Sequence, residues 1–275
     1  MTKPTPTPTE IGRGYDDFAE LLDQVWGENL HHGYWEDDTT SLEDATNRLT
    51  DKLSGMLSIK PGDRLLDLGC GIGEPAIRLA TKHDIEVVGV SISKRQIERA
   101  NERAEAAGLS DRLSFQLADA MDLPFPDESF DIVWAMESMH HMPDRWHVLR
   151  HAARVLRPGG RLAIADFLLI QGTDGKEPDA ARVHEASKGV LTVVGLDEYL
   201  SHIREAGLVP DATEDVSQYT RPSWGKAAVR FEALREQAEP HIGTEQFNLV
   251  LSRFDNFSAE SMLGYALMTA RKPAQ

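Results

Sequence analysis

A short glycine-rich stretch after an apolar run constrains this chain more than any other feature. The residues LLDLGCGIGEPA (65–76) fit a buried strand that ends at Asp67, a turn with Gly69, Gly71 and Gly73 in alternation, and the start of a helix. Glycines permit tight turning and close approach of a ligand to the backbone. The first turn of a helix offers unpaired N–H groups. The stretch therefore predicts a strand–turn–helix unit that holds a small ligand.

The same theme of apolar run, turn and amphipathic segment repeats as far as residue 170. The apolar runs are RLLDLG, EVVGVSI, LSFQLADA, FDIVWAM and RLAIADFLLI. They do not alternate cleanly with polar residues, as expected of strands that are covered on both faces. A further helix and strand are expected over 196–216, two helices over 221–256 and a last strand over 265–272. The sequence thus predicts an α/β fold with a doubly wound, seven-stranded, mostly parallel sheet.

Composition shifts along the chain suggest its organisation. Ser41, with Asp44 three positions later, is expected to open a helix over 41–58. The N-terminal alternation of Thr and Pro cannot form a core. We expect a disordered tail at 1–9, an N-terminal helical cap at 10–60, a ligand-binding core at 61–220, a helical lid at 221–260 inserted before the last strand, and the final strand and tail at 261–275.

Charge and cysteine content restrict the partners and the compartment. The formal net charge of −16 over 275 residues argues against binding to nucleic acid or to an anionic membrane surface. A single cysteine, Cys70, excludes an internal disulfide and favours a reducing compartment. The N-terminus lacks an apolar signal segment, and no run approaches the roughly 18–20 apolar residues of a membrane span. We expect a soluble cytoplasmic protein with a small-molecule partner, and homo-oligomerisation stays open.

Two classes of cofactor use a turn of this kind. A dinucleotide site needs G-x-G-x-x-G or A, which Gly71, Gly73 and Ala76 match, but it also needs an acidic residue about 20 positions later. The second strand ends in VGVSIS (88–93) and carries no acid there. The alternative pattern, acid-x-G-x-G-x-G, is matched in full from Asp67 to Gly73. A NAD-dependent oxidoreductase is therefore disfavoured.

LLDLGCGIG resembles the first motif of class I S-adenosylmethionine (SAM) dependent methyltransferases. ADAMDLPFPDESFD (118–131) resembles their adenine-contacting turn and following strand, and VLRPGG (155–160) the turn before their fifth strand. WGENLHHGYWE, SMHHMPD and IADF narrow the resemblance to small-molecule O-methyltransferases of bacterial natural-product pathways, in particular the rebeccamycin-type sugar 4′-O-methyltransferases. The resemblance implies a Rossmann-like fold, SAM as methyl donor and S-adenosylhomocysteine as product.

The same resemblance implies which residues hold SAM. Many class I members place an acidic residue at the end of the second strand, where this chain has Ser91 and Ile92. The natural-product subgroup also has a Ser there and a Gln on the next helix, here Gln96, so these two are expected to contact the ribose or the methionine part. The expected cofactor-binding residues are Asp67, Gly69, Gly71, Gly73, Ser91, Ile92, Gln96, Asp119, Ala120 and Met121.

Two adjacent histidines and an aspartate suggest the catalytic side. His140 and His141 follow the fourth strand, and Asp166 ends the fifth. Ends of neighbouring parallel strands lie about 5 Å apart, on the side where such sheets bind ligands. An imidazole suits removal of an alcohol proton, and a carboxylate on its other nitrogen fixes the tautomer. By resemblance to the sugar methyltransferases, His140 is the expected base, His141 the second choice and Asp166 the orienting acid; no metal signature is present.

Several alternatives stay open. Function resides in sites rather than folds, so the glycine turn also fits a methyltransferase-fold cyclase of a polyketide pathway that binds SAM without methyl transfer, or an N- or C-methyltransferase. The histidines favour O-methylation of a glycosylated or polyketide natural product. His31 and His32, in NLHHGYWE, belong to a segment that covers bound SAM or packs in the core, and Glu137 faces either the cofactor or solvent.

Overall fold

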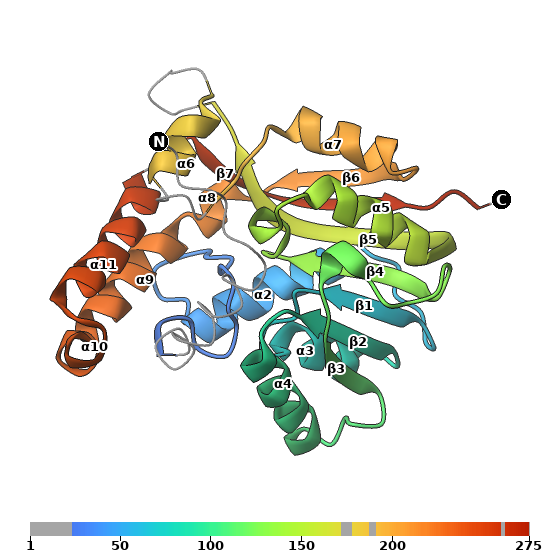
Figure 1. Ribbon diagram of the computed structural model, residues 1–275, viewed down its shortest axis with the longest axis horizontal. Coiled ribbons are helices and arrows are strands. Elements are labelled where there is room, and N and C mark those ends of the chain that lie inside the picture. Colours follow the sequence, from blue (N-terminus) through green and yellow to red (C-terminus); the bar gives the residue numbers. More distant parts are fainter. Residues whose placement is uncertain (1–23, 172–177, 187–190, 260–261, 275) are drawn as a thin grey trace.

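A seven-stranded sheet forms the centre of the structure, as the repeated strand–helix pattern predicts (Figure 1). The computed structural model describes four stretches of the chain: 24–171, 178–186, 191–259 and 262–274. The predicted tail at 1–9 and the first part of the helical cap expected over 10–60 lie outside the described residues. The strands are β1 (Arg64–Leu68), β2 (Glu86–Ser91), β3 (Leu113–Leu117), β4 (Phe130–Met136), β5 (Leu156–Leu169), β6 (Val209–Asp215) and β7 (Leu263–Arg271).

The strand order is β3-β2-β1-β4-β5-β7-β6. All pairs from β3 to β5 are parallel, and β7 runs antiparallel to both β5 and β6. The chain winds outward from β1 to β3 and then returns to build β4 on the other side of β1. This reversal places a switch point between β1 and β4, and open α/β sheets bind ligands outside the carboxyl ends of strands at such a point.

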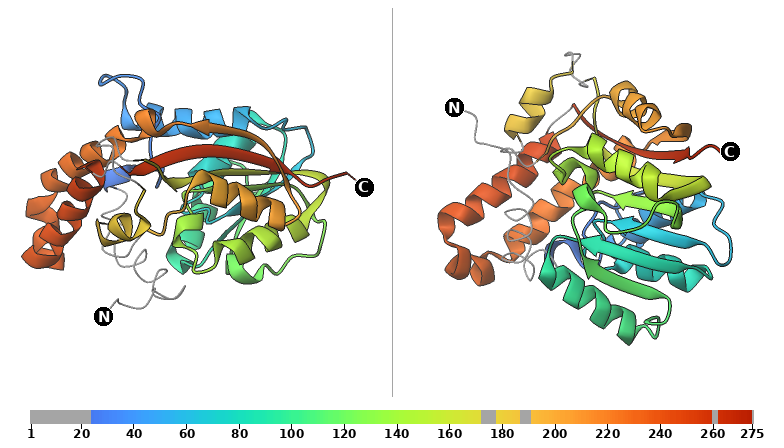
Figure 2. Two further views of the ribbon diagram at one scale, coloured as in Figure 1. Left: turned by 90° about the horizontal axis from the view of Figure 1, so that it is seen from above. Right: turned by 45° about the vertical axis from the view of Figure 1, so that its right-hand side comes forward.

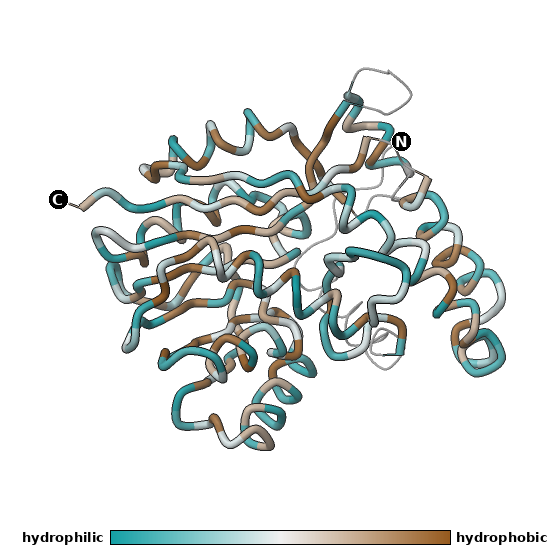
Figure 3. The backbone as a smooth tube through the Cα atoms, turned by 180° about the vertical axis from the view of Figure 1, so that it is seen from behind, coloured by the Kyte–Doolittle hydropathy of each residue, from teal (hydrophilic) through white to brown (hydrophobic). Residues whose placement is uncertain are grey.

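Helices cover both faces of the sheet and bury two separate cores (Figure 2). Successive residues of β4 point to opposite faces, so Trp134 belongs to one core and Val133 to the other. Figure 3 shows hydrophobic residues gathered in the strands, with hydrophobic and hydrophilic positions alternating along the outer helices. One core includes α2 (Leu42–Gly55), α3 (Glu74–Lys82) and α4 (Lys94–Ala106), and the other α5 (Arg145–Val155) and α7 (Leu196–Glu205).

The predicted start of α2 is confirmed by its cap. The Ser41 hydroxyl accepts a hydrogen bond from the Asp44 N–H at 3.0 Å and donates one to the Asp44 carboxylate at 2.7 Å. The first of these bonds satisfies one of the N–H groups that the first helical turn leaves unpaired. A difference from expectation occurs at β5, which begins at Leu156 rather than after the turn expected over 155–160, because Leu156 pairs with Phe130 across an irregularity in the ladder.

A group of helices lies between β6 and β7 in the chain and projects from one end of the sheet (Figure 1). Two helices were expected there, but three long segments are present because Leu234 leaves helical geometry and Gly243 has a φ of +83°. None of the helices in the described residues combines the length and the apolar character that a membrane-spanning segment needs. The segments here are α8 (Ser217–Thr220), α9 (Pro222–Ala233), α10 (Arg235–Ile242) and α11 (Thr244–Ala259); the remaining short helix, α6 (Ala180–Ala186), precedes α7.

Candidate active site

The three glycines after β1 all adopt positive φ, at +76° for Gly69, +53° for Gly71 and +85° for Gly73. Two of them also allow close packing. A Cβ on Gly69 would lie 2.4 Å from Ser138 Cβ, and one on Gly73 would lie 2.8 Å from the Phe115 ring. A Cβ on Gly71 would meet only Leu30 Cδ1, at 3.7 Å. Gly71 is thus the open part of the turn, where backbone faces a pocket instead of a neighbouring side chain.

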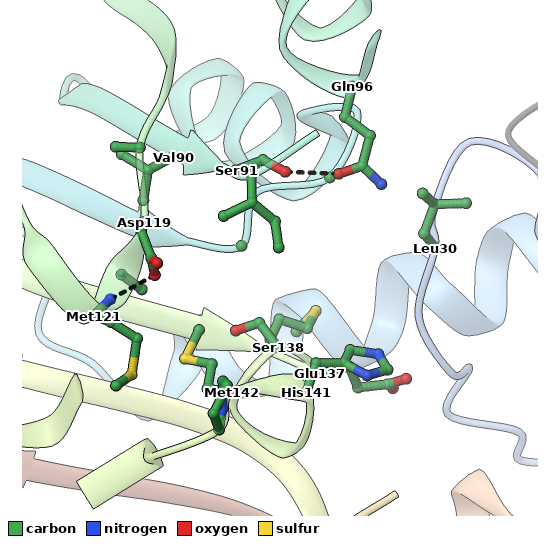
Figure 4. Close-up of a pocket in the computed structure, with 17 residues that line it drawn as sticks. Leu30, Val90, Ser91, Gln96, Asp119, Met121, Glu137, Ser138, His141 and Met142 are labelled. Atoms are coloured by element: carbon green, nitrogen blue, oxygen red, sulfur yellow. Dashed lines mark hydrogen bonds between the residues drawn. The ribbon is translucent and has the colours of Figure 1, made fainter. Parts of the chain in front are cut away.

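A pocket opens between this turn and the ends of β2, β3 and β4 (Figure 4). Figure 4 shows Ser91, Gln96 and Asp119 on one side of it, and Ser138 and His141 on the other. Among the residues expected to bind the cofactor, those that line the pocket are Gly69, Gly71, Ser91, Ile92, Gln96, Asp119, Ala120 and Met121. Asp67 and Gly73, also expected there, are not part of its lining.

The polar groups on the β2–β3 side are held by local hydrogen bonds. Ser91 Oγ donates to Gln96 Oε1 at 2.8 Å and accepts from the Ser93 N–H at 3.1 Å. Asp119 Oδ1 accepts from the Met121 N–H at 2.9 Å, which caps the 3-10 helix η1 (Ala120–Asp122). The Ser91 and Gln96 pair predicted from the sequence therefore acts as one unit. Preorganised polar groups beside apolar walls are typical of small-molecule sites.

Asp67 is buried at the end of β1 with 3% of its surface exposed. Its carboxyl makes no hydrogen bond within the described part of the chain, and burial raises its pKa to about 7. An unpartnered carboxyl directly before a glycine cradle suits a ligand that carries positive charge, because such charge would stabilise the ionised form. SAM carries ammonium and sulfonium groups, so the donor set fits the cofactor that the sequence resemblance implies.

On the opposite side, β4 and β5 bring His140 against Asp166. His140 Nδ1 donates to Asp166 Oδ1 at 2.7 Å, and the Phe167 N–H donates to the same oxygen at 2.9 Å. Tyr199 of α7 donates its hydroxyl proton to Asp166 Oδ2 at 3.1 Å. Asp166 is fully buried, and both of its carboxylate oxygens accept hydrogen bonds. His140 and Asp166 lie together as expected, although β5 does not end at Asp166 but continues to Leu169 against β7. The contribution of Tyr199 was not predicted from the sequence.

The two histidines are in contact with each other. They lie in the 3-10 helix η2 (Met139–His141), with 3.0 Å between their Nε2 atoms. His141 lines the pocket, whereas His140 lies behind it. Burial, the imidazole of His140 and the guanidinium of Arg145 lower the pKa of His141 well below its ordinary value. His141 is therefore neutral at physiological pH.

The hydrogen bonds determine where the ring protons are. Asp166 accepts the Nδ1 proton of His140, so the lone pair of this ring in its neutral form is on Nε2. In that form, the proton shared by the two Nε2 atoms, 3.0 Å apart, comes from His141. Nδ1 of neutral His141 then has no proton and is its basic nitrogen.

Two residues that the sequence did not single out support this arrangement. Buried Arg145, at the start of α5, donates to both oxygens of Thr192, and the Thr192 hydroxyl donates to the backbone carbonyl of His140 at 3.1 Å. The guanidinium thus joins the segment before α7 to the histidine pair. Among the described residues, no group of three or more His, Cys, Asp or Glu is placed to hold a metal ion.

Glu137, which the sequence left between cofactor and solvent, lines the pocket but directs its carboxylate to the N-terminal segment. It accepts from the His32 N–H at 2.7 Å, from His32 Nδ1 at 2.8 Å and from the Tyr265 hydroxyl at 2.7 Å. Burial would raise the pKa of Glu137, but the imidazole and backbone N–H of His32 outweigh it and lower the pKa to about 2. Glu137 therefore fastens the NLHHGYWE segment beside the pocket.

Comparison with known proteins gives consistent results. Residues 66–164 match the family model of a methyltransferase domain. Over 273 residues the chain is 66% identical to the 27-O-demethylrifamycin SV methyltransferase of Amycolatopsis mediterranei (strain S699), covering 99% of this chain and 100% of the relative. It is 41% identical over 269 residues to methyltransferase GfsG of Streptomyces halstedii, covering 96% and 94%. The crystal structure of the [4+2]-cyclase SpnF matches with a TM-score of 0.86 and 32% identity, covering 100% of both chains.

Proposed function

This chain belongs to the class I SAM-dependent methyltransferases, and on that basis we propose that it methylates a hydroxyl group of a polyketide natural product. One observation carries the proposal. A glycine cradle and a neutral, pocket-lining His141 face each other, and His141 is connected through His140 to the buried carboxylate of Asp166. This is the arrangement that removal of a hydroxyl proton beside a bound methyl donor requires.

SAM, when bound, supplies an electrophilic methyl group on a sulfonium. Gly69 and Gly71 offer backbone that a ligand can approach closely, and Ser91 with Gln96 offers bonded polar groups on the β2 side. Asp119 and the apolar residues Ala120 and Met121 form the wall proposed for the adenine. Asp67 lies behind the cradle and contributes negative charge once it is ionised.

His141 Nδ1 is the atom proposed to take the hydroxyl proton of the acceptor. Its Nε2 proton can then pass to His140, 3.0 Å away, whose positive charge the Asp166 carboxylate stabilises at 2.7 Å. General-base help of this kind is worth about 10²–10⁴-fold in rate. The sequence resemblance ranked His140 first as the base; contact with the pocket favours His141 in that role, with His140 as the link to Asp166.

The acceptor class rests on the relatives. The relative at 66% identity is named for a rifamycin substrate, which favours a polyketide hydroxyl. A sugar hydroxyl, as in the rebeccamycin-type enzymes, is an alternative and more specific acceptor, and it is supported by the sequence motifs alone. We also propose that α9–α11 form a lid over the acceptor, because they follow one sheet-edge strand and pack against the N-terminal segment through Trp224 and Trp26, whose rings lie 6.1 Å apart.

A second candidate is a cyclase. It is favoured by the full-length similarity to the [4+2]-cyclase SpnF at 32% identity. Cyclisation needs no base for an alcohol proton, so the continuous path from His141 to Asp166 supports O-methylation instead. The two functions differ in whether the methyl group is transferred from SAM, and a single methyl-transfer assay distinguishes them.

The test is incubation of the full chain with methyl-labelled SAM and 27-O-demethylrifamycin SV. We expect label on an acceptor oxygen and one S-adenosylhomocysteine per methyl transferred. Asp166→Asn should slow transfer, whereas His241→Ala, which changes an exposed histidine of α10, should not. Tight SAM binding without transfer to this or to any other hydroxyl acceptor would refute the proposal and favour the cyclase.

A further inference from the structure

A second carboxylate–imidazole pair lies outside the path just described. His32 is 2% exposed, and its Nδ1 lies 2.8 Å from Glu137 Oε2. Its other ring nitrogen, Nε2, is buried and has no hydrogen-bond partner among the described residues. A carboxylate on Nδ1 fixes the tautomer that the ring adopts in its neutral form, and in that form Nε2 carries a lone pair for which no described residue supplies a donor.

The unused nitrogen contrasts with the adjacent histidine. Both ring nitrogens of buried His31 lie within hydrogen-bond distance of protein oxygens: Nδ1 at 2.7 Å from the His32 carbonyl, and Nε2 at 3.1 Å from Asn29 Oδ1 and 3.2 Å from Thr50 Oγ1. Buried polar atoms are nearly always bonded, because an unpaired one has lost its bond to water without replacement. The same segment thus provides hydrogen-bond partners for both ring nitrogens of His31 but none for Nε2 of His32.

Aromatic rings enclose His32 on several sides. Their centroids lie 4.3 Å away for Trp224, 5.0 Å for Phe167, 5.2 Å for Trp26 and 5.9 Å for Tyr265. An apolar wall with one convergent polar atom is typical of a site for a largely apolar ligand. Trp224 belongs to α9 and Trp26 to the N-terminal segment, so the enclosure lies where the proposed lid meets that segment.

The enclosure is close to the proposed catalytic histidines. His140 packs on Phe167 at 4.9 Å and His32 on the same ring at 5.0 Å, so the two imidazole centroids are at most 9.9 Å apart. Glu137, the partner of His32, itself lines the cofactor pocket. Its φ of +48° is rare for a residue with a side chain. Backbone held in such a region is most often found at functional sites.

We propose that His32 Nε2 accepts a hydrogen bond from a second hydroxyl of the methyl acceptor, and that the aromatic rings around it hold the acceptor's apolar body. This inference rests on the proposed O-methylation and names its substrate class: an apolar molecule with at least two hydroxyl groups, one methylated and one bound by His32. Because Nε2 is buried, this binding requires a ring of the enclosure to move aside, and Trp224, at 4.3 Å the nearest of the four rings, is the one we propose.

The direct test uses the unmodified full chain labelled with ¹⁵N-histidine, studied by NMR with S-adenosylhomocysteine and then with 27-O-demethylrifamycin SV. The His32 signals are assigned by their loss in His32→Gln. We expect the ¹⁵N chemical shift of His32 Nε2 to be that of an unprotonated nitrogen. It should not change when S-adenosylhomocysteine is added, and it should change when the acceptor is added. An unchanged Nε2 signal while other signals report acceptor binding, or a protonated Nε2, would overturn the inference.

Two substitutions separate the role of each ring nitrogen. His32→Asn keeps a donor near the position of Nδ1 for Glu137 but lacks an acceptor atom at Nε2, whereas His32→Gln does the reverse. We expect His32→Asn to lower kcat/KM for the acceptor about tenfold, the usual effect of one lost hydrogen bond, with SAM affinity unchanged, and His32→Gln to lower it less. Equal losses in both, or a loss confined to SAM affinity, would contradict the role. If wild type transfers no methyl, O-methylation fails, while the NMR shift still decides whether His32 binds the acceptor.

Discussion

The buried carboxyl of Asp67 makes the stability of this protein depend on pH in a predictable direction. Its pKa is about 7 in the folded protein, against an ordinary value of 3.8. Each unit of difference in pKa corresponds to about 1.4 kcal/mol, so ionisation of Asp67 costs about 4 kcal/mol of folding free energy. Well below pH 3.8 the group is protonated in both states and nothing is lost. The loss accumulates as pH rises from about 4 to 7 and levels off above pH 7.

Asp67→Asn keeps the shape of the side chain and removes the ionisation. Urea unfolding of both proteins between pH 4 and 8 measures the effect, and the difference in unfolding free energy, variant minus wild type, should rise by about 4 kcal/mol over that range. Asp111→Asn, which changes an exposed acid, is the matched control and should show no such rise. Parallel pH profiles for wild type and Asp67→Asn would refute the reasoning.

The same carboxyl connects stability to ligand binding. A positively charged ligand near Asp67 lowers the pKa of its carboxyl, so SAM affinity of the wild type should increase between pH 5 and 8. Asp67→Asn should bind SAM more weakly at pH 8 and show little dependence on pH. Calorimetric titration across this range measures both. A wild-type SAM affinity that does not change with pH would show that the ionisation of Asp67 does not affect SAM binding.

Three further outcomes follow from the geometry of the site. Because the pKa of His141 lies well below its ordinary value, kcat/KM should stay high as pH falls through 6.5, and a pH–rate profile with an acidic limb at or above 6.5 would exclude His141 as the base. Gly69→Ala should lower the free energy of unfolding in urea by about 2–4 kcal/mol, from positive φ and overpacking together. Gly71→Ala has only the cost of positive φ, about 1–2 kcal/mol, and should chiefly weaken SAM binding; equal losses of stability and of SAM affinity in the two variants would contradict this difference. Tyr199→Phe, which removes one bond to Asp166, should slow transfer less than tenfold, and its pH–rate profile reports whether the base has changed.

Local pattern was sufficient for most of the fold. The apolar runs, the helix-opening Ser41 and the glycine turn each depend on residues near one another in the sequence, and these parts of the prediction are confirmed. The contact between His140 and Asp166, 26 residues apart, was also predictable, because ends of neighbouring parallel strands must lie together. The extra break in the helices before β7 was missed because Leu234 has no sequence signal for leaving helical geometry.

Long-range packing decides what the sequence could not. A glycine of the turn can be required either for ligand binding or for packing against another residue. Gly73 is required for packing, because the Phe115 ring of β3 leaves no room for a side chain there. Which histidine faces the pocket depends on the 3-10 turn after β4. The pairing of Glu137 with His32 spans 105 residues, and no spacing rule connects a strand end with a segment that folds over it. Such contacts become visible only in three dimensions.

Single-turnover transfer from labelled SAM to 27-O-demethylrifamycin SV, in wild type and in His141→Ala, tests most directly whether a pocket-lining imidazole removes the acceptor proton beside the glycine cradle. We predict equal SAM affinity in both proteins and a transfer rate about 10²–10⁴-fold lower in the variant. Transfer by His141→Ala at the wild-type rate, with SAM bound normally, would contradict the central claim.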